Sequence, residues 1–242
     1  MIGTVAIVDA TRGLLAGADV AQMAQACGRQ LREHVAPAWL LAPPTVQVYS
    51  LPELLTPPGA WIVRLVRSEG DLDLGWHTAA GTLPFGVVEV APILAAGGGA
   101  LVGHGPDAPS VSAVLSHELC ETLVDPEADS WEPGPGGVDY ALEVCDPVQG
   151  SAYSLDGVDL SDWVWPKWFD ATVHGTPTAG GLLLDAFEIA PGGYALQRAR
   201  DGSTTEVFGA VPPPAWRLRG ARRRRRLARW DSLQIIASPR PE

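Results

Sequence analysis

The sequence predicts an α+β fold with a mixed four-stranded sheet, a long helix after the sheet and an irregular C-terminal part. Three observations predict this order. Short runs of β-forming residues dominate the first 90 positions, one amphipathic helical pattern interrupts them, and an apolar helix-forming stretch begins near Val111. With 242 residues and 46% hydrophobic content, the chain is long enough to bury a full core.

The first strand is expected at Thr4–Val8, a short apolar run. An amphipathic helix is expected over residues 18–39, where apolar side chains recur at helical spacing: Val20, Met23, Ala24, Cys27 and Leu31. Three further strands are expected at Thr45–Leu51, Ala60–Val66 and Gly81–Val90, which alternate in polarity or are rich in β-formers.

A Gly-rich loop then leads to the main helix. Ser110 can cap a helix that runs from about Val111 to Val124. Asp125 ends it, because the α region is disfavoured for the residue before Pro126. Beyond this point the chain is rich in loop-forming residues, so its C-terminal part is expected to be irregular.

The main helix carries an H-E-x-x-E pattern formed by His117, Glu118 and Glu121. Positions i and i+4 lie one above the other on a helix, so His117 and Glu121 can hold one ion. Glu118 points beside that ion, towards the same cleft. The layout is that of a zinc-peptidase helix in which a carboxylate replaces the second histidine.

The region from His117 to Asp146 resembles the active-site region of zincin metallopeptidases. HELCETLVDP is similar to the helix of thermolysin-type gluzincins, with Glu121 in place of the second histidine. A closer resemblance is to plant EXORDIUM proteins and related bacterial sequences, through His117, Glu118, Glu121, Asp125, Pro126, Trp131, Glu143 and Asp146. Residues 153–169 and the PGGY at 191–194 resemble uncharacterised bacterial and phage proteins.

The resemblance implies a zincin-like fold and a metal-dependent hydrolase, most directly a zinc peptidase. His117, Glu121 and Glu143 would hold the ion, with Asp146 as the alternative third ligand. Asp146 or Asp125 would otherwise accept the second imidazole N–H of His117. Glu118 would act as general base on a zinc-bound water. Two anionic ligands offset the charge of the ion, so Mn²⁺ or Ca²⁺ is an alternative to zinc.

Two other interpretations stay open beside a hydrolase with a peptide or protein substrate. The first is a catalytically silent zincin scaffold that serves as a structural or interaction module, for example in a phage particle or another assembly. The second is a nucleic-acid-associated protein led by its basic tail.

Other candidate residues have simpler interpretations. His77 and His104 can approach the cleft, but a turn or surface position is favoured for both. Three tryptophans of DWVWPKWF can form an aromatic wall, but packing is favoured for Trp163, Trp165 and Trp168.

The three cysteines, Cys27, Cys120 and Cys145, show neither disulfide-scaffold nor CxxC spacing. We therefore expect them to be reduced, with a bridge between Cys120 and Cys145 as the alternative. The N-terminus shows no signal-peptide pattern and no apolar run that could span a membrane, which predicts a cytoplasmic protein without membrane association. Association with a virion or another assembly is the alternative.

Charge divides the chain into two parts. Residues 1–210 hold 8 basic and 26 acidic residues, a net charge of −18, and residues 211–242 hold 9 basic and 2 acidic residues, a net charge of +7. We therefore predict a metal-binding domain over 1–210 and a Pro/Arg-rich extension over 211–242. An acidic body disfavours nucleic acid as its main ligand, because phosphate contacts need a basic face.

The extension contains an arginine block: Arg222, Arg223, Arg224, Arg225 and Arg226. Arginine favours bidentate contacts with phosphate or carboxylate groups. Nucleic acid, an anionic surface and the acidic body itself are therefore its candidate partners.

We predict that a chain ending at Ala210 folds and keeps its metal ion. A run of adjacent arginines cannot be buried without matching acids, so the extension should not belong to the core. Thermal unfolding and elemental analysis of both chain lengths check this. Loss of the ion, or a much lower Tm for the shorter chain, would make the extension part of the fold.

Overall fold

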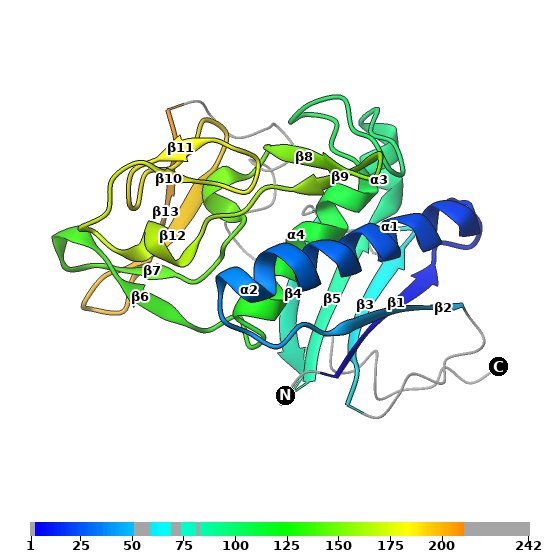
Figure 1. Cartoon of the computed structure of the whole chain (residues 1–242), viewed down its shortest axis with the longest axis horizontal. Coiled ribbons are helices and arrows are strands. Elements are labelled where there is room, and N and C mark those ends of the chain that lie inside the picture. Colours follow the sequence, from blue (N-terminus) through cyan, green and yellow to red (C-terminus); the bar gives the residue numbers. More distant parts are fainter. Residues whose placement is uncertain (1–2, 51–58, 69–73, 81–82, 211–242) are drawn as a thin grey trace.

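The computed structural model describes residues 3–50, 59–68, 74–80 and 83–210, and the predicted extension lies outside them. Its centre is a five-stranded mixed sheet with the strand order β2-β1-β3-β5-β4 (Figure 1). The strands are β1 (Thr4–Ala10), β2 (Thr45–Ser50), β3 (Trp61–Val66), β4 (Gly75–Ala80) and β5 (Leu83–Glu89). All neighbours pair in parallel except β4 and β5, which are antiparallel.

The mixed sheet was predicted, but the prediction of four strands is wrong. The strand that the sequence pattern missed is β4, whose sequence GWHTAA contains one β-branched residue and follows a polar stretch of sequence. Its register with β5 places His77 opposite Gly86 and Trp76 opposite Val87. Pairing with β5 therefore makes this segment a strand despite its weak local propensity.

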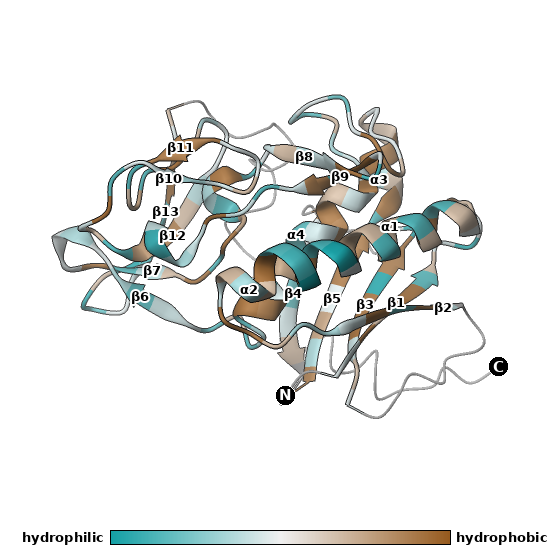
Figure 2. Cartoon of the chain, viewed as in Figure 1, coloured by the Kyte–Doolittle hydropathy of each residue, from teal (hydrophilic) through white to brown (hydrophobic). Residues whose placement is uncertain are grey.

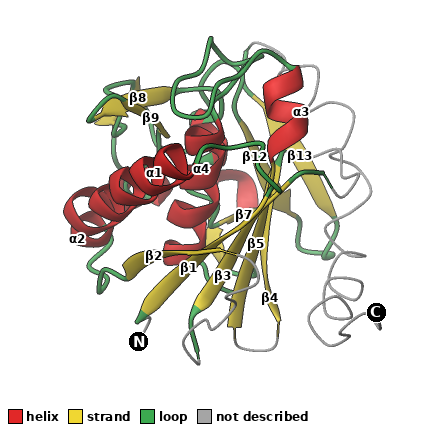
Figure 3. Ribbon diagram, turned by 90° about the vertical axis from the view of Figure 1, so that its right-hand side faces the viewer, coloured by secondary structure: helices red, strands yellow, loops and turns green. Residues whose placement is uncertain are grey.

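Three helical segments follow one another where one amphipathic helix was expected. They are α1 (Gly17–Gln30), a π-helical turn η1 (Leu31–Val35) and α2 (Ala36–Ala38). A short helix α3 (Val90–Ala95) follows β5, and α4 (Val111–Val124) has the predicted bounds. Figure 3 shows α1 and α4 on the same side of the sheet, where α1 contacts β2 and α4 contacts β4 and β5.

Helix α4 is enclosed by the rest of the domain. Ser110 caps it by accepting a hydrogen bond from the Ala113 amide at 3.0 Å. Two serines of α4 bind the backbone of the C-terminal half of the chain. Ser112 Oγ donates to the Asp159 carbonyl at 2.7 Å, and Ser116 Oγ accepts from the Ser161 amide at 2.6 Å. These small side chains hold strand β9 against the helix, opposite the sheet. A further face of α4 lines a cavity.

The C-terminal half is built from short antiparallel strands and is more regular than predicted. One sheet has the order β13-β12-β7-β6, and two hairpins are formed by β8 with β9 and by β10 with β11. The strands are β6 (Trp131–Pro133), β7 (Asp139–Ala141), β8 (Ala152–Leu155), β9 (Val158–Ser161), β10 (Thr176–Pro177), β11 (Leu183–Leu184), β12 (Tyr194–Arg198) and β13 (Thr204–Phe208). The 3-10 turns are η2 (Pro135–Gly137), η3 (Asp146–Val148) and η4 (Pro166–Phe169).

Apolar side chains gather between the sheet and the helices. Figure 2 shows brown residues along the central strands and teal ones on the outer side of α1. In the C-terminal half Trp163 and Trp168 are buried, which confirms the packing interpretation for both. The ring centroids of Trp168 and Phe187 are 5.4 Å apart. Trp165, in contrast, is 39% exposed and stacks on Trp163.

Among the helices of the described residues, none combines the length and apolar character that a bilayer span requires.

Candidate metal centre

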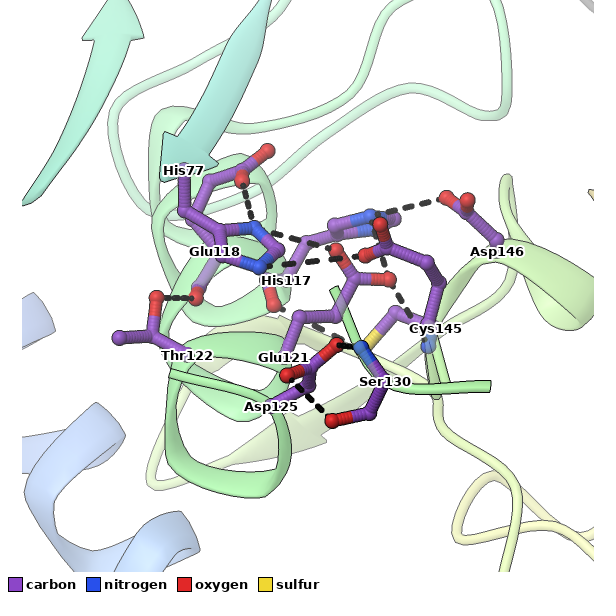
Figure 4. A network of polar contacts seen from close by, with 10 residues as sticks. His77, His117, Glu118, Glu121, Thr122, Asp125, Ser130, Cys145 and Asp146 are labelled. Carbon is purple, nitrogen blue, oxygen red and sulfur yellow. Dashed lines mark hydrogen bonds and ion pairs between the residues drawn. The ribbon is translucent and has the colours of Figure 1, made fainter. Parts of the chain in front are cut away.

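The open face of α4 presents His117, Glu118 and Glu121 to one cavity (Figure 4). The cavity has a volume of about 700 Å³. It lies between β4, α4, the 128–131 loop and the β12–β13 hairpin. Glu143 and Asp146, from the segment that follows β7, line it as well. The structure thus brings together His117, Glu118, Glu121, Glu143 and Asp146 around one cavity.

His77 joins this group from β4, which corrects its expected turn or surface position. Its side chain is only 4% exposed. Nδ1 lies 3.2 Å from Glu118 Oε2 and 3.6 Å from Glu121 Oε2. Nε2 lies 3.9 Å from Glu143 Oε2 and has no hydrogen-bond partner within the described part of the chain. A buried donor without a partner costs free energy. A bound ligand, or a small movement of the ring towards Glu143, would give Nε2 a partner.

His117 occupies the other side of Glu121. Its Nε2 lies 3.3 Å from Glu121 Oε1 and 3.3 Å from Asp146 Oδ1. Glu121 Oε1 also accepts a hydrogen bond from the Cys145 amide at 3.2 Å. The turn after β7 therefore fixes both Glu121 and the carboxylate of Asp146 beside the helix.

Three groups of side chains have ligand atoms within 4.8 Å of one another. They are His77 with Glu118 and Glu121, His117 with Glu121 and Cys145, and Glu121 with Glu143 and Asp146. Glu121 belongs to all three. Imidazole nitrogen and carboxylate oxygen are ligands of Zn²⁺ and related divalent ions, so the donor set fits such an ion.

Charge inside the cavity is partly balanced by the two imidazoles. Burial lowers the pKa of His77, but Glu118, Glu143 and Glu121 outweigh it and raise the pKa to about 9. Burial also lowers the pKa of His117, and its neighbours, Glu121 first, raise that pKa well above its ordinary value. Without metal, these carboxylates therefore favour the cationic form of both rings. A metal ion must displace these protons, because it binds the neutral ring.

The three cysteines are thiols. Cys27, Cys120 and Cys145 are free and buried, as expected for reduced cysteines. Burial and the neighbouring Cys120 raise the pKa of Cys145 well above its ordinary value. Its Sγ donates to the His117 carbonyl at 3.8 Å. Cys145 thus lies near the cluster with its thiol directed at the helix backbone.

Asp125 closes the loop at the end of α4. Its carboxylate accepts hydrogen bonds from the amide and the hydroxyl of Ser130, each at 2.9 Å. Burial raises its pKa, while the bonds from Ser130 oppose that change. Asp125 lines the cavity, and its predicted contact with His117 stays a prediction. His104, in contrast, is exposed on its loop, as expected.

One sequence signal could have located His77. Successive residues of a strand point to opposite faces of the sheet, so the side chains of Trp76 and His77 in GWHTAA must lie on opposite faces. The Trp76 ring lies 5.8 Å from Phe85, in the small apolar cluster around Val66 and Val87. His77 therefore faces α4.

Comparisons with protein-family models, curated proteins and solved structures found no match. The likeness to zincins accordingly rests on the motif residues, and the zincin fold is not confirmed. What the structure establishes is a mixed α+β fold with a buried His/Glu/Cys cluster that is compatible with a metal ion.

Gly75 makes room for the cluster, and we predict that Gly75→Ala destabilises the protein. A Cβ at this position would lie 2.6 Å from Glu118 Oε1 and 2.8 Å from Val114 Cγ1. Overpacking of this kind costs about 1–3 kcal/mol. Urea unfolding measures it. Gly86→Ala on the neighbouring strand is the control, since its Cβ meets no atom closer than 3.4 Å. Equal stability of both variants would show that Glu118 does not lie against β4.

The metal-free protein should lose stability as the pH rises from about 6.5 to about 9. A pKa raised on folding stabilises the folded chain below the ordinary histidine pKa of about 6.5, and this contribution disappears as the pH passes the folded value of about 9. For His77 the total is on the order of 3 kcal/mol.

Urea unfolding in the presence of a chelator checks this pH dependence. His77→Asn should make it shallower, with the contribution of His117 remaining. His174→Asn should leave it unchanged, because the His174 side chain is 80% exposed. A free energy of unfolding that stays constant or rises with pH in the chelated wild type contradicts the assignment.

Proposed function

We propose that the protein is a metal-dependent hydrolase, most directly a peptidase. The observation that carries this proposal is the position of the cluster. Histidines and carboxylates with metal-ligand spacing lie buried at one side of an open cavity large enough for a short peptide segment. Concave sites with a few convergent polar groups are the usual location of active sites.

For the ligands, we retain His117 and Glu121, with Glu143 or Asp146 as the third. His117 Nε2 faces both Glu121 and Asp146 at 3.3 Å, and Glu143 belongs with these two carboxylates to one group. When bound, a zinc ion supplies Lewis-acid polarisation of a carbonyl group and lowers the pKa of a water molecule.

Glu118 is the general base in this proposal. It adjoins His117 on α4, is buried, and has Oε2 3.2 Å from His77 Nδ1. His77 orients this carboxylate, because a hydrogen bond from the ring fixes the position of Oε2. A general base held in this way can accept the proton of an attacking water and pass it to the leaving group.

The cavity walls favour an extended peptide. β4 is at one end of the described sheet, and its residues from Gly75 to Thr78 line the cavity. Edge strands bind extended peptides by adding a strand through main-chain hydrogen bonds. Opposite, Arg198 lies 4.3 Å above the Trp131 ring and also lines the cavity. This wall offers an apolar surface to side chains of the substrate, since the Arg198 guanidinium is already paired with Asp139 at 2.8 Å.

We predict that Glu118→Gln keeps the ion on His117 but lowers the turnover of an unbiased peptide library about 10²- to 10⁴-fold. The amide preserves the size of the side chain and removes the base. Zinc-loaded protein, elemental analysis and mass spectrometry of the library provide the measurement. Glu127→Gln is the matched control, since Glu127 is exposed and outside the cavity lining.

Two outcomes contradict parts of this proposal. Wild-type turnover by Glu118→Gln would make Glu118 a structural residue. No turnover by either zinc-loaded protein would favour the silent scaffold.

A further inference from the structure

Glu121 lies between two imidazoles and directs one oxygen at each. Its Oε2 is 3.6 Å from His77 Nδ1, and its Oε1 is 3.3 Å from His117 Nε2. Figure 4 shows the two rings on either side of this carboxylate. A carboxylate in this position has both oxygens available to separate ions.

Each side of Glu121 holds a further carboxylate oxygen at ligand spacing. Glu118 Oε2 is 3.2 Å from His77 Nδ1, and Asp146 Oδ1 is 3.3 Å from His117 Nε2. Two ligand atoms on one tetrahedral ion, with bonds of about 2.1 Å, lie about 3.4 Å apart. The two distances from Glu121 to the rings, and the distances from His77 to Glu118 and from His117 to Asp146, are all close to that value.

The second nitrogen of His77 provides an independent observation. The side chain is 4% exposed, and Nε2 has no hydrogen-bond partner among the described residues. A histidine that binds a metal through one nitrogen usually donates the N–H of the other to a carboxylate. Glu143 Oε2, at 3.9 Å, is within reach of Nε2 after a small shift.

We propose that the cavity holds two divalent cations bridged by Glu121. One lies between His117, Glu121 and Asp146, and the second between His77, Glu118 and Glu121. Ions in two-metal sites are about 3.5–4 Å apart, a separation that one bridging carboxylate spans. Four carboxylates, with Glu143 beside His77, balance the charge of two such ions once both rings are neutral.

The second cation changes the role of Glu118. This inference builds on the proposed function, in which Glu118 Oε2 accepts a proton when only the first ion is bound. When the second cation occupies its position, that oxygen is a ligand and no longer a base. Hydrolysis should therefore be slower at zinc concentrations that fill both positions than at those that fill one.

Zinc stoichiometry tests the proposal without reference to activity. Full-length protein is dialysed against excess free zinc at pH 8, and the bound metal is measured by elemental analysis. We expect two ions per chain for the wild type and for the control His174→Asn. His77→Asn should retain one, since the amide preserves the hydrogen bond to Glu118 but not the metal ligand. Glu121→Ala should lose both.

One zinc ion in the wild type would overturn the second position while leaving the hydrolase proposal intact. No bound zinc would overturn both. Two ions in His77→Asn would place the second ion elsewhere. Loss of only one ion in Glu121→Ala would show that Glu121 does not bridge the two ions. Circular dichroism of each variant confirms folding. His77→Gln replaces His77→Asn, and Glu121→Gln replaces Glu121→Ala, if the first variant does not fold.

Discussion

Burial of several carboxylates around one helix face is the constraint on which the rest of the structure depends. Glu118, Glu121, Glu143 and Asp146 are all buried, and unpaired buried charges are costly. The two imidazoles lie on opposite sides of Glu121 and can supply positive charge, and the proposed metal ion would supply more in the same space. Such an arrangement favours a bound cation, and groups with strongly shifted pKa values cluster at functional sites.

The packing of α4 follows from this constraint. The helix must bring its acidic face to the cavity while its other faces remain in the core. Leu115 and Leu119 are fully buried, and Ser112 and Ser116 let β9 approach closely through hydrogen bonds to its backbone. Gly75 does the same for β4. Small residues at these contacts therefore determine how deeply the His/Glu cluster is held.

Sequence reasoning predicted α4 to the residue, because a serine cap, an apolar stretch and a residue before proline define its ends locally. It also brought Glu143 and Asp146 to the helix through their spacing in the motif. It missed β4 and His77, because that strand exists through pairing with β5 rather than through its own propensity. The partition of Glu121 between two rings was equally out of reach, since it depends on side-chain positions contributed by a strand, a helix and a turn.

X-ray absorption spectroscopy of the zinc-loaded protein tests the central claim most directly, because it reports the atoms bound to the ion. Histidine and carboxylate ligands give nitrogen and oxygen at about 2.0–2.2 Å together with the outer-shell scattering of imidazole. We expect this spectrum, with no sulfur in the first shell. A sulfur shell at about 2.3 Å would assign the ion to Cys145, and a shell without imidazole scattering would place it outside the cluster.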